Sequence, residues 1–306
     1  MSNLPNYVVI TPARNEAKFI ELTLRSVVSQ TVRPLKWVIV NNGSTDGTEQ
    51  IVSKYARNHS WIELVCMADV DERNFASKVH AFNAGYARLV NLDFSVIASL
   101  DADISFDNDY FSFLLDKLSC DPGLGLVGTP FQETSRESYD YRFVSIEHVS
   151  GACQVFRRQC FEAIGGYKPL IGGGVDHLAV ITARMKGWKT RTFTEKMCVH
   201  HREMGTAQHG AIAARFRYGL KDYVFGNHPF WEVCRVGYQM TRRPYVIGGL
   251  ALLTGYICAM SKRLNRPLSP EVVRFQRGEQ MQRLRRFVRG EGLGFGSDAK
   301  ASSGCR

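Results

Sequence analysis

The sequence of 306 residues lacks several patterns that would assign it to a familiar class of protein. Its N-terminus has neither the basic stretch nor the apolar run of a signal peptide, so export is not expected. None of its eight cysteines forms a C-x-x-C pair, which removes the usual spacing of zinc and redox sites and predicts reduced thiols in the cytoplasm. No G-x-G-x-x-G follows the first apolar segment, which argues against a dinucleotide-dependent oxidoreductase.

A long apolar run is also missing. The uncharged stretch 244–261 would reach at most about 27 Å as a helix, less than a hydrocarbon core of ~30 Å. Three interpretations stay open for it: a buried helix packed on the rest of the protein, an interfacial or re-entrant membrane segment, and a full membrane span.

Acidic residues are scarce behind this stretch. Of the overall charge of +10, segment 262–289 contributes nine Lys and Arg against Glu271 and Glu279. A solvated helix face is the plain interpretation, whereas contact with anionic lipid is the sharper one. Nucleic acid fits less well, because few aromatic residues interleave the arginines for base stacking.

The first half of the chain alternates strand-like and helix-like segments. Strands are predicted at 7–11, 37–40, 62–67 and 96–100, and helices at 16–30, 48–55, 77–90 and 110–118. Further strands are predicted at 150–156 and 197–199. A further helix is predicted at 159–164, and another follows the glycines 172–174 and runs to about residue 186. This order predicts an α/β fold with a mostly parallel sheet covered by helices on both faces. Ligands of such sheets bind beyond the carboxyl ends of the strands.

Two aspartates, Asp101 and Asp103, directly follow the predicted strand 96–100. In an extended chain they point to the same side, with Ala102 facing away. Two converging carboxylates can hold Mg²⁺ or Mn²⁺, and such a cation can hold a diphosphate. A solvated turn or a helix N-cap is the alternative.

Together with this pair, the order of motifs resembles the family 2 glycosyltransferases, which are inverting enzymes of the GT-A fold. The resemblance covers roughly residues 6–202 and rests on five segments: T-P-A-R-N-E at 11–16, N-G-S-T-D-G at 42–47, Lys78 with Asn83 and Gly85, D-A-D at 101–103, and Gly165-Gly166 followed by Asp176.

The resemblance implies where a nucleotide-sugar would bind. The matching positions for its base and ribose are Pro12, Arg14, Glu16 and Asn42. The family usually has aspartate at the position of Asn42, and an amide offers both a donor and an acceptor, so the base stays open. Lys78 is the position that would offset the charge of the diphosphate.

The resemblance also implies how the chemistry is divided. Asp103 would contact the metal ion, and Asp101 would bind the ribose or a metal-bound water. Asp176 matches the catalytic base, although an N-cap of the following helix is the structural alternative. Either His200 or His201 would add a metal ligand, and a histidine that binds no metal is the alternative. Only one of two neighbours on a strand can face the site, and His200 is preferred.

These observations predict a metal-dependent glycosyltransferase using Mg²⁺ or Mn²⁺ and a UDP- or GDP-sugar. The expected acceptor is a hydroxyl of a glycan or lipid-linked molecule in bacterial polysaccharide or glycoconjugate synthesis. Residues 1–230 would form the catalytic domain, 231–290 a helical appendage that contacts an anionic membrane at its cytoplasmic face, and 291–306 a flexible tail. An inactive basic adaptor is one alternative. A sugar nucleotidyltransferase is another, but it would carry a Gly-rich basic loop after the first strand.

Overall fold

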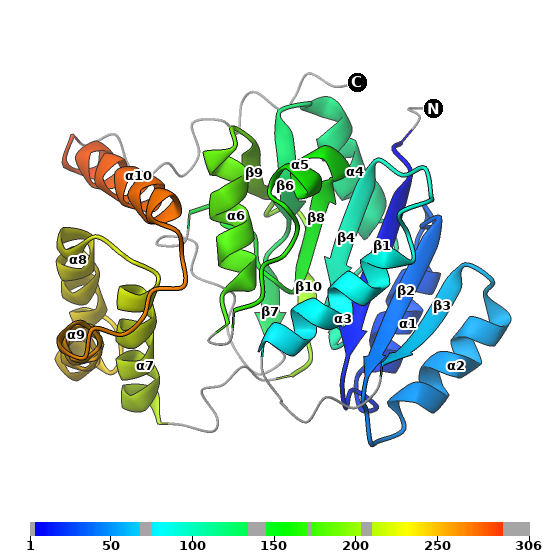
Figure 1. The fold of residues 1–306 in the computed structure, drawn as a ribbon, viewed down its shortest axis with the longest axis horizontal. Helices are drawn as coiled ribbons and strands as arrows, with labels where there is room; N and C mark the ends of the chain where they lie inside the picture. Colours follow the sequence, from blue (N-terminus) through cyan, green and yellow to red (C-terminus); the bar gives the residue numbers. More distant parts are fainter. Residues whose placement is uncertain (1–3, 68–74, 134–144, 171–172, 203–209, 290–306) are drawn as a thin grey trace. The chain divides into compact units, whose positions relative to one another are not determined.

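The computed structural model describes residues 4–67, 75–133, 145–170, 173–202 and 210–289 (Figure 1). Their contacts divide the chain into two compact units, one extending to Arg202 and one formed by residues 210–289. The sequence-based expectation placed this division at residue 230. By contacts, the helix Ala211–Val224, which precedes residue 230, belongs to the second unit.

The first unit is built on a seven-stranded sheet in the order β3-β2-β1-β4-β8-β6-β9. The strands are β1 (Tyr7–Ala13), β2 (Lys36–Asn42), β3 (Ile62–Met67), β4 (Val96–Leu100), β6 (Leu124–Gly128), β8 (Cys153–Arg157) and β9 (Lys189–Thr192). Strands β3, β2, β1 and β4 are parallel, and β6 is parallel to β9. Only β8 runs antiparallel to both of its neighbours. The sheet is therefore mixed but mostly parallel, as the alternating pattern predicts.

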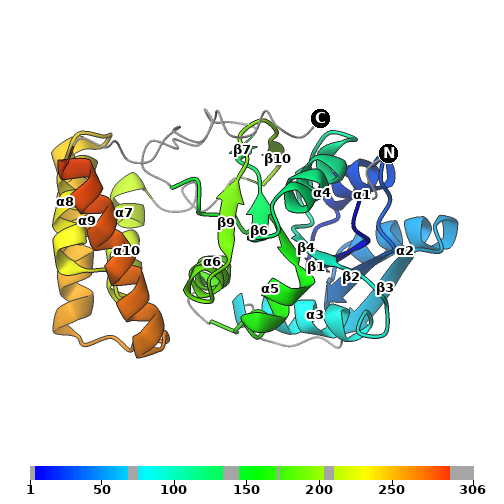
Figure 2. The same ribbon diagram turned by 90° about the horizontal axis from the view of Figure 1, so that it is seen from above.

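Helices cover both faces of this sheet (Figure 2). They are α1 (Ile20–Val28), α2 (Thr48–Asn58), α3 (Phe75–Ala87), α4 (Tyr110–Cys120), α5 (Arg158–Ala163) and α6 (Val175–Met185). Side chains of α1, α2 and α4 share one hydrophobic core, and side chains of α3, α5 and α6 share another. A close contact fixes α3 on the sheet, since a Cβ at Gly85 would lie 2.8 Å from Ile10 Cγ2. Gly85, one of the residues on which the family resemblance rests, is therefore needed for the packing of α3 on the sheet.

A second, three-stranded sheet completes this unit. It consists of β5 (Ile104–Ser105), β7 (Phe131–Glu133) and β10 (Cys198–His200), with β10 in the middle. Strand β10 runs antiparallel to β5, and His200 lies opposite Ile104 in the register. This pairing brings the end of β10 to the residues that follow β4.

The second unit contains the helices α7 (Ala211–Val224), α8 (Pro229–Met240), α9 (Tyr245–Ser261) and α10 (Pro270–Val288). Helices α7 and α9 cross at glycines. A Cβ at Gly219 would lie 2.0 Å from the backbone oxygen of Leu252, and one at Gly255 would lie 2.1 Å from that of Phe216. Among the described helices, none is long and apolar enough to cross a membrane.

Buried polar side chains tie the remaining helices of this unit together. Asn227 Oδ1, between α7 and α8, accepts hydrogen bonds from Gln276 at 2.5 Å and Gln280 at 2.7 Å, both on α10. Arg235 donates to Asp222 at 2.6 Å. The neighbouring Glu232 is only 2% exposed, and neither of its carboxylate oxygens has a partner among the described residues. Burial raises the pKa of Glu232 to about 7, and the charge of Asp222 adds to this shift.

Candidate active site

The predicted site residues gather at one edge of the large sheet. Strands β2, β1 and β4 are adjacent and parallel, so their carboxyl ends lie side by side. Pro12 lies near the end of β1, Asn42 ends β2, and Asp101 follows β4 directly. This edge is where ligands of parallel α/β sheets bind.

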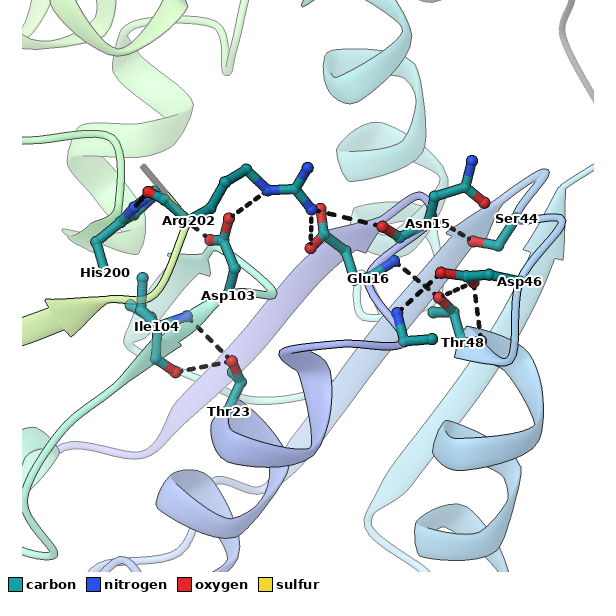
Figure 3. A network of polar contacts seen from close by, with 11 residues as sticks. Asn15, Glu16, Thr23, Ser44, Asp46, Thr48, Asp103, Ile104, His200 and Arg202 are labelled. Atoms are coloured by element: carbon teal, nitrogen blue, oxygen red, sulfur yellow. Dashed lines mark hydrogen bonds and ion pairs between the residues drawn. The ribbon is translucent and has the colours of Figure 1, made fainter. Parts of the chain in front are cut away.

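The loops after β1 and β2 are joined by hydrogen bonds between side chains and backbone (Figure 3). Asn15, at a positive φ of 56°, donates its N–H to Ser44 Oγ at 3.0 Å and accepts the Thr45 N–H at 2.8 Å. Glu16 donates its N–H to Thr48 Oγ1 at 2.8 Å. These bonds hold residues 14–19 in turns. Helix α1 therefore begins at Ile20, four residues later than the sequence pattern predicts.

Asp101 and Asp103 converge, but by a different route from the one the sequence suggested. The chain leaves β4 at Leu100 and turns at Ala102 and Asp103 before β5 begins. The extended geometry assumed for the pair is therefore wrong. The turn and the pairing of β5 with β10 assemble the cluster. One ligand atom each from Asp101, Asp103 and His200 lie within 4.8 Å of one another.

His200 faces the carboxylates with its Nε2 atom. Its Nδ1–H donates to the backbone oxygen of Arg202 at 2.5 Å, which leaves Nε2 3.5 Å from Asp103 Oδ1. In a neutral imidazole that Nε2 carries a lone pair. A lone pair and a carboxylate, both buried, need a proton or a cation between them, and metal-binding histidines are oriented by the same kind of backbone bond. The donor set thus fits a divalent cation.

His201 turns away from this cluster. Its Nε2 lies 2.8 Å from Ser105 Oγ, and its ring stacks on Phe19 with centroids 6.2 Å apart. Burial lowers the pKa of His201. Of the two adjacent histidines, His200 is the one that reaches the carboxylates.

Arg202 is the site residue that sequence reasoning missed. Its Nε donates to Asp103 Oδ2 at 3.1 Å, and its Nη2 donates to Glu16 at 2.5 Å (Figure 3). Burial raises the pKa of Glu16 to about 7, the charge of Asp103 adds to this, and Arg202 opposes it. The only local signal for Arg202 is its spacing of two residues from His200.

Lys78 on α3 pairs with Asp101, its Nζ lying 2.5 Å from Oδ1. Desolvation lowers the pKa of Lys78, but the combined effect of Asp101, Asp176 and Asp103 outweighs it and raises that pKa above its usual value. Desolvation raises the pKa of Asp101, which Lys78 opposes and Asp103 reinforces. The ammonium group of Lys78 thus lies against one of the carboxylates of the cluster.

Asn42 is 4% exposed and has one free hydrogen-bonding atom. Its Nδ2 donates to Ser77 Oγ at 3.2 Å, while its Oδ1 has no partner among the described residues. With the amide donor engaged, the atom left over is an acceptor. In this respect Asn42 is similar to the aspartate that is usual at this position in the family.

Asp176 lies in the first turn of α6, half-buried. The N-cap of that helix is Gly174, at a φ of 86°, so the N-cap interpretation of Asp176 is wrong. Its carboxylate lies against Gly151, where a Cβ would come within 3.2 Å of Oδ2. Its coulombic effect on Lys78 places Asp176 within electrostatic reach of the cluster.

Known proteins resemble this chain in sequence. The family described as Glycosyl transferase family 2 matches residues 8–165. The glycosyltransferase AglE of Haloferax volcanii is 29% identical over 193 residues, which cover 58% of this chain and 60% of that protein. The poly-beta-1,6-N-acetyl-D-glucosamine synthase of Staphylococcus aureus is 27% identical over 44% of this chain and 31% of its own length. The chain thus spans less than two thirds of these relatives.

Solved structures share the fold. The mannosyltransferase PcManGT from Pyrobaculum calidifontis, in complex with GDP-Man and Mn²⁺, is similar with a TM-score of 0.57 and 21% identity, over 95% of this chain and 84% of that one. TarS 1–349 of S. aureus in complex with UDP-GlcNAc has a TM-score of 0.54 and 15% identity, over 71% of this chain and 65% of that one. Because the family match covers half of the sequence, this chain belongs to glycosyl transferase family 2.

Proposed function

We propose that the chain is a metal-dependent, inverting glycosyltransferase that moves a sugar from a nucleoside diphosphate to a hydroxyl. The observation that carries the proposal is the convergence of Asp101, Asp103 and His200 at the carboxyl edge of the sheet. As the glycosidic bond breaks, negative charge builds up on the departing nucleoside diphosphate. A site of this composition can hold a divalent cation that stabilises this charge.

Asp103 and His200 would hold the Mg²⁺ or Mn²⁺ ion. When bound, this ion supplies positive charge next to the leaving diphosphate. Asp101 would bind the ribose or a water of the ion, and its partner Lys78 would turn its ammonium group toward the diphosphate. The pairing of Lys78 with Asp101 supports this role, because it keeps the cation close to the cluster.

The nucleoside would bind along the loops after β1 and β2, at Pro12, Arg14, Glu16 and Asn42. The Oδ1 atom of Asn42 supports this, since it can accept a hydrogen bond from the ring N–H group of a base. Uracil and guanine both present such an N–H group. This fits either a UDP- or a GDP-sugar, and the similar structures carry UDP-GlcNAc in one case and GDP-Man in another.

Asp176 would take the proton from the acceptor hydroxyl. Inversion needs one carboxylate on the face opposite the leaving group, and a general base contributes about 10²–10⁴-fold to the rate. Its place at the start of α6, half-buried and with its carboxylate beside Gly151, supports this role. The acceptor would be a glycan or a lipid-linked molecule in polysaccharide or glycoconjugate synthesis, as the names of the relatives suggest.

Calorimetry with UDP-GlcNAc and GDP-Man, each with and without Mn²⁺, tests the donor site. We expect metal-dependent binding of at least one donor, and NMR of the transferred sugar should show an inverted anomeric configuration. Absence of metal-dependent heat with both donors would favour the inactive adaptor. Release of pyrophosphate from a nucleoside triphosphate and a sugar phosphate would identify a nucleotidyltransferase instead.

A further inference from the structure

The excess positive charge of the protein lies in the second unit. Residues 210–289 contain fifteen Lys and Arg but four Asp and Glu, whereas the rest of the chain has 24 basic and 25 acidic residues. Two of the four acids, Asp222 and Glu232, are buried. The charge on the surface of this unit is therefore almost entirely positive.

Helix α9 has two unlike faces and carries no charged residue. One face packs on its neighbours through Gly248, Gly249, Leu252, Gly255, Tyr256 and Ala259. The opposite face exposes large apolar side chains: Val246 by 54%, Ile247 by 57%, Leu250 by 48%, Ile257 by 46% and Met260 by 48%. At 100° per residue, these five lie within one side of the helix. An apolar face of this extent marks an interaction surface.

The apolar surface continues from α9 onto α7. An open groove of about 700 Å³ lies between the two helices, and its lining is almost entirely apolar. Ile212 and Phe216 line it from α7, and Ile247 and Leu250 line it from α9. Ile212 is itself 51% exposed. We call this groove and the exposed side of α9 the apolar face.

Exposed cations border the apolar face at both ends. Arg243 precedes α9, and Lys262 and Arg263 follow it. Arg217 and Lys221 are exposed on α7. Cations beside a stripe of aliphatic side chains are the composition of a helix that lies in a membrane interface.

We propose that the apolar face docks on an anionic lipid bilayer, with α9 lying along the headgroup boundary. The 17 residues of α9 extend about 25 Å, enough to insert several aliphatic side chains while the flanking cations reach lipid phosphates. The proposal does not depend on the transferase activity, because it uses none of the residues of the candidate active site.

Charge favours lipid over a second copy of the chain as the occupant. A two-fold dimer through this face would place the same patch of each copy against the other. Because both ends of α9 are cationic, with Arg243 at one end and Lys262 and Arg263 at the other, cations of the two copies would meet in either orientation of the paired helices. Like charges brought together at an interface cost affinity. An anionic bilayer supplies both the apolar phase and the opposite charge.

Co-sedimentation with vesicles tests the proposal on the full-length protein, without any nucleotide. We expect binding to vesicles of phosphatidylcholine and phosphatidylglycerol at 3:1, and much weaker binding to phosphatidylcholine alone. The double variant Leu250→Gln/Ile257→Gln should bind at least tenfold more weakly. The matched control is Leu22→Gln/Leu35→Gln in the first unit, where exposures of 40% and 44% are similar. This control should bind like the unchanged protein.

A second variant measures the contribution of charge to vesicle binding separately from that of apolar contact, and it changes only exposed side chains. Lys262→Gln/Arg263→Gln should weaken binding to the anionic vesicles by about fivefold per cation, which corresponds to ~1 kcal/mol each. Equal loss in both double variants and the control would overturn the proposal. It would also be overturned by unchanged binding in Leu250→Gln/Ile257→Gln, or by absent vesicle binding together with a dimer in ultracentrifugation that this variant dissociates.

Discussion

The Arg202 guanidinium links two carboxylates, lying 3.1 Å from Asp103 and 2.5 Å from Glu16. It binds Asp103 Oδ2 while His200 faces Oδ1, so Asp103 is shared between a fixed cation and the proposed metal ligand. A divalent ion would compete with Arg202 for the same carboxylate and would be repelled by its charge.

Replacing Arg202 by glutamine should therefore strengthen the binding of Mn²⁺ in the absence of nucleotide, by about tenfold. One unit charge at this distance is worth at least ~1 kcal/mol even in a well-solvated site, and more where the site is half-buried. Calorimetric titration with Mn²⁺ measures the effect. Arg88→Gln is the control, because Arg88 also pairs with a glutamate but lies in the turn after α3, with its side chain 57% exposed. Unchanged or weaker Mn²⁺ binding in Arg202→Gln would contradict this expectation.

Asp103→Ala should abolish metal-dependent donor binding, because it removes a carboxylate that is 9% exposed and faces His200. We expect the Mn²⁺-dependent part of the calorimetric signal to disappear and transfer to fall by at least 10²-fold. Asp107→Ala is the matched control, since that side chain is 76% exposed and four residues away. Full metal-dependent binding in Asp103→Ala would refute the assignment of the site.

Asp176→Asn should separate binding from chemistry. The amide keeps the shape of the side chain at the start of α6 but cannot accept the hydroxyl proton. Donor affinity should stay within about twofold, while the transfer rate should fall by about 10²–10⁴-fold. Asp116→Asn on the outer side of α4 should change neither quantity. A normal transfer rate in Asp176→Asn would assign the base elsewhere.

Gly219→Ala should destabilise the second unit, because the new Cβ would lie 2.0 Å from a backbone oxygen of α9. Overpacking of this kind costs ~1–3 kcal/mol or more, since the two helices must move apart. Gly237→Ala on α8 is the control, as a Cβ there meets nothing within 4 Å. Its helix propensity should stabilise the protein by about 0.5–1 kcal/mol. Urea denaturation followed by circular dichroism should show opposite shifts of the midpoint.

The buried Glu232 predicts a pH dependence of stability. Its pKa is raised from 4.5 to about 7 in the folded protein, so between these pH values the folded state keeps a proton that the unfolded chain has lost. Stability should therefore fall as the pH rises from about 4.5 to 7, by on the order of 3 kcal/mol. Thermal unfolding from pH 5 to 8 measures this.

Glu232→Gln should remove the part of that slope that Glu232 contributes, leaving the part from Glu16, and should raise the melting temperature at pH 8, since the amide is neutral throughout. The exposed Glu271 on α10 supplies the control Glu271→Gln. A variant Glu232→Gln that is less stable than the unchanged protein at pH 8 would show that the carboxylate is needed in its ionised form.

Sequence reasoning succeeded where local pattern decides structure. Strands β3 and β4 have the predicted bounds, because each is a short, mostly apolar segment. Strand β6 was missed, because Gly125 and Gly128 interrupt its pattern. A Cβ at Gly125 would lie 2.6 Å from Cys160 Sγ on α5, so the glycine is required by a neighbour far along the chain.

The candidate site divides in the same way. Asp101, Asp103 and Asp176 were proposed because they occupy recognisable motifs at the starts and ends of elements, and the structure brings Asp101 and Asp103 together with His200. The turn at Ala102 and the ion pairs of Arg202 were not found, since they depend on the pairing of β5 with β10. No property of the residues near Arg202 reports on a partner 99 residues away.

The late position of β10 has a consequence for biosynthesis. The three-residue strand that carries His200 pairs with β5, next to Asp103, only after nearly two hundred residues have been translated. At roughly 5–20 residues per second, a nascent chain that has emerged as far as Asp103 waits about 5–20 s for Arg202, 99 residues later. During that interval two neighbouring carboxylates stand without their histidine and arginine. An arrested nascent chain ending near residue 165 would therefore carry the aspartates but no complete cation site.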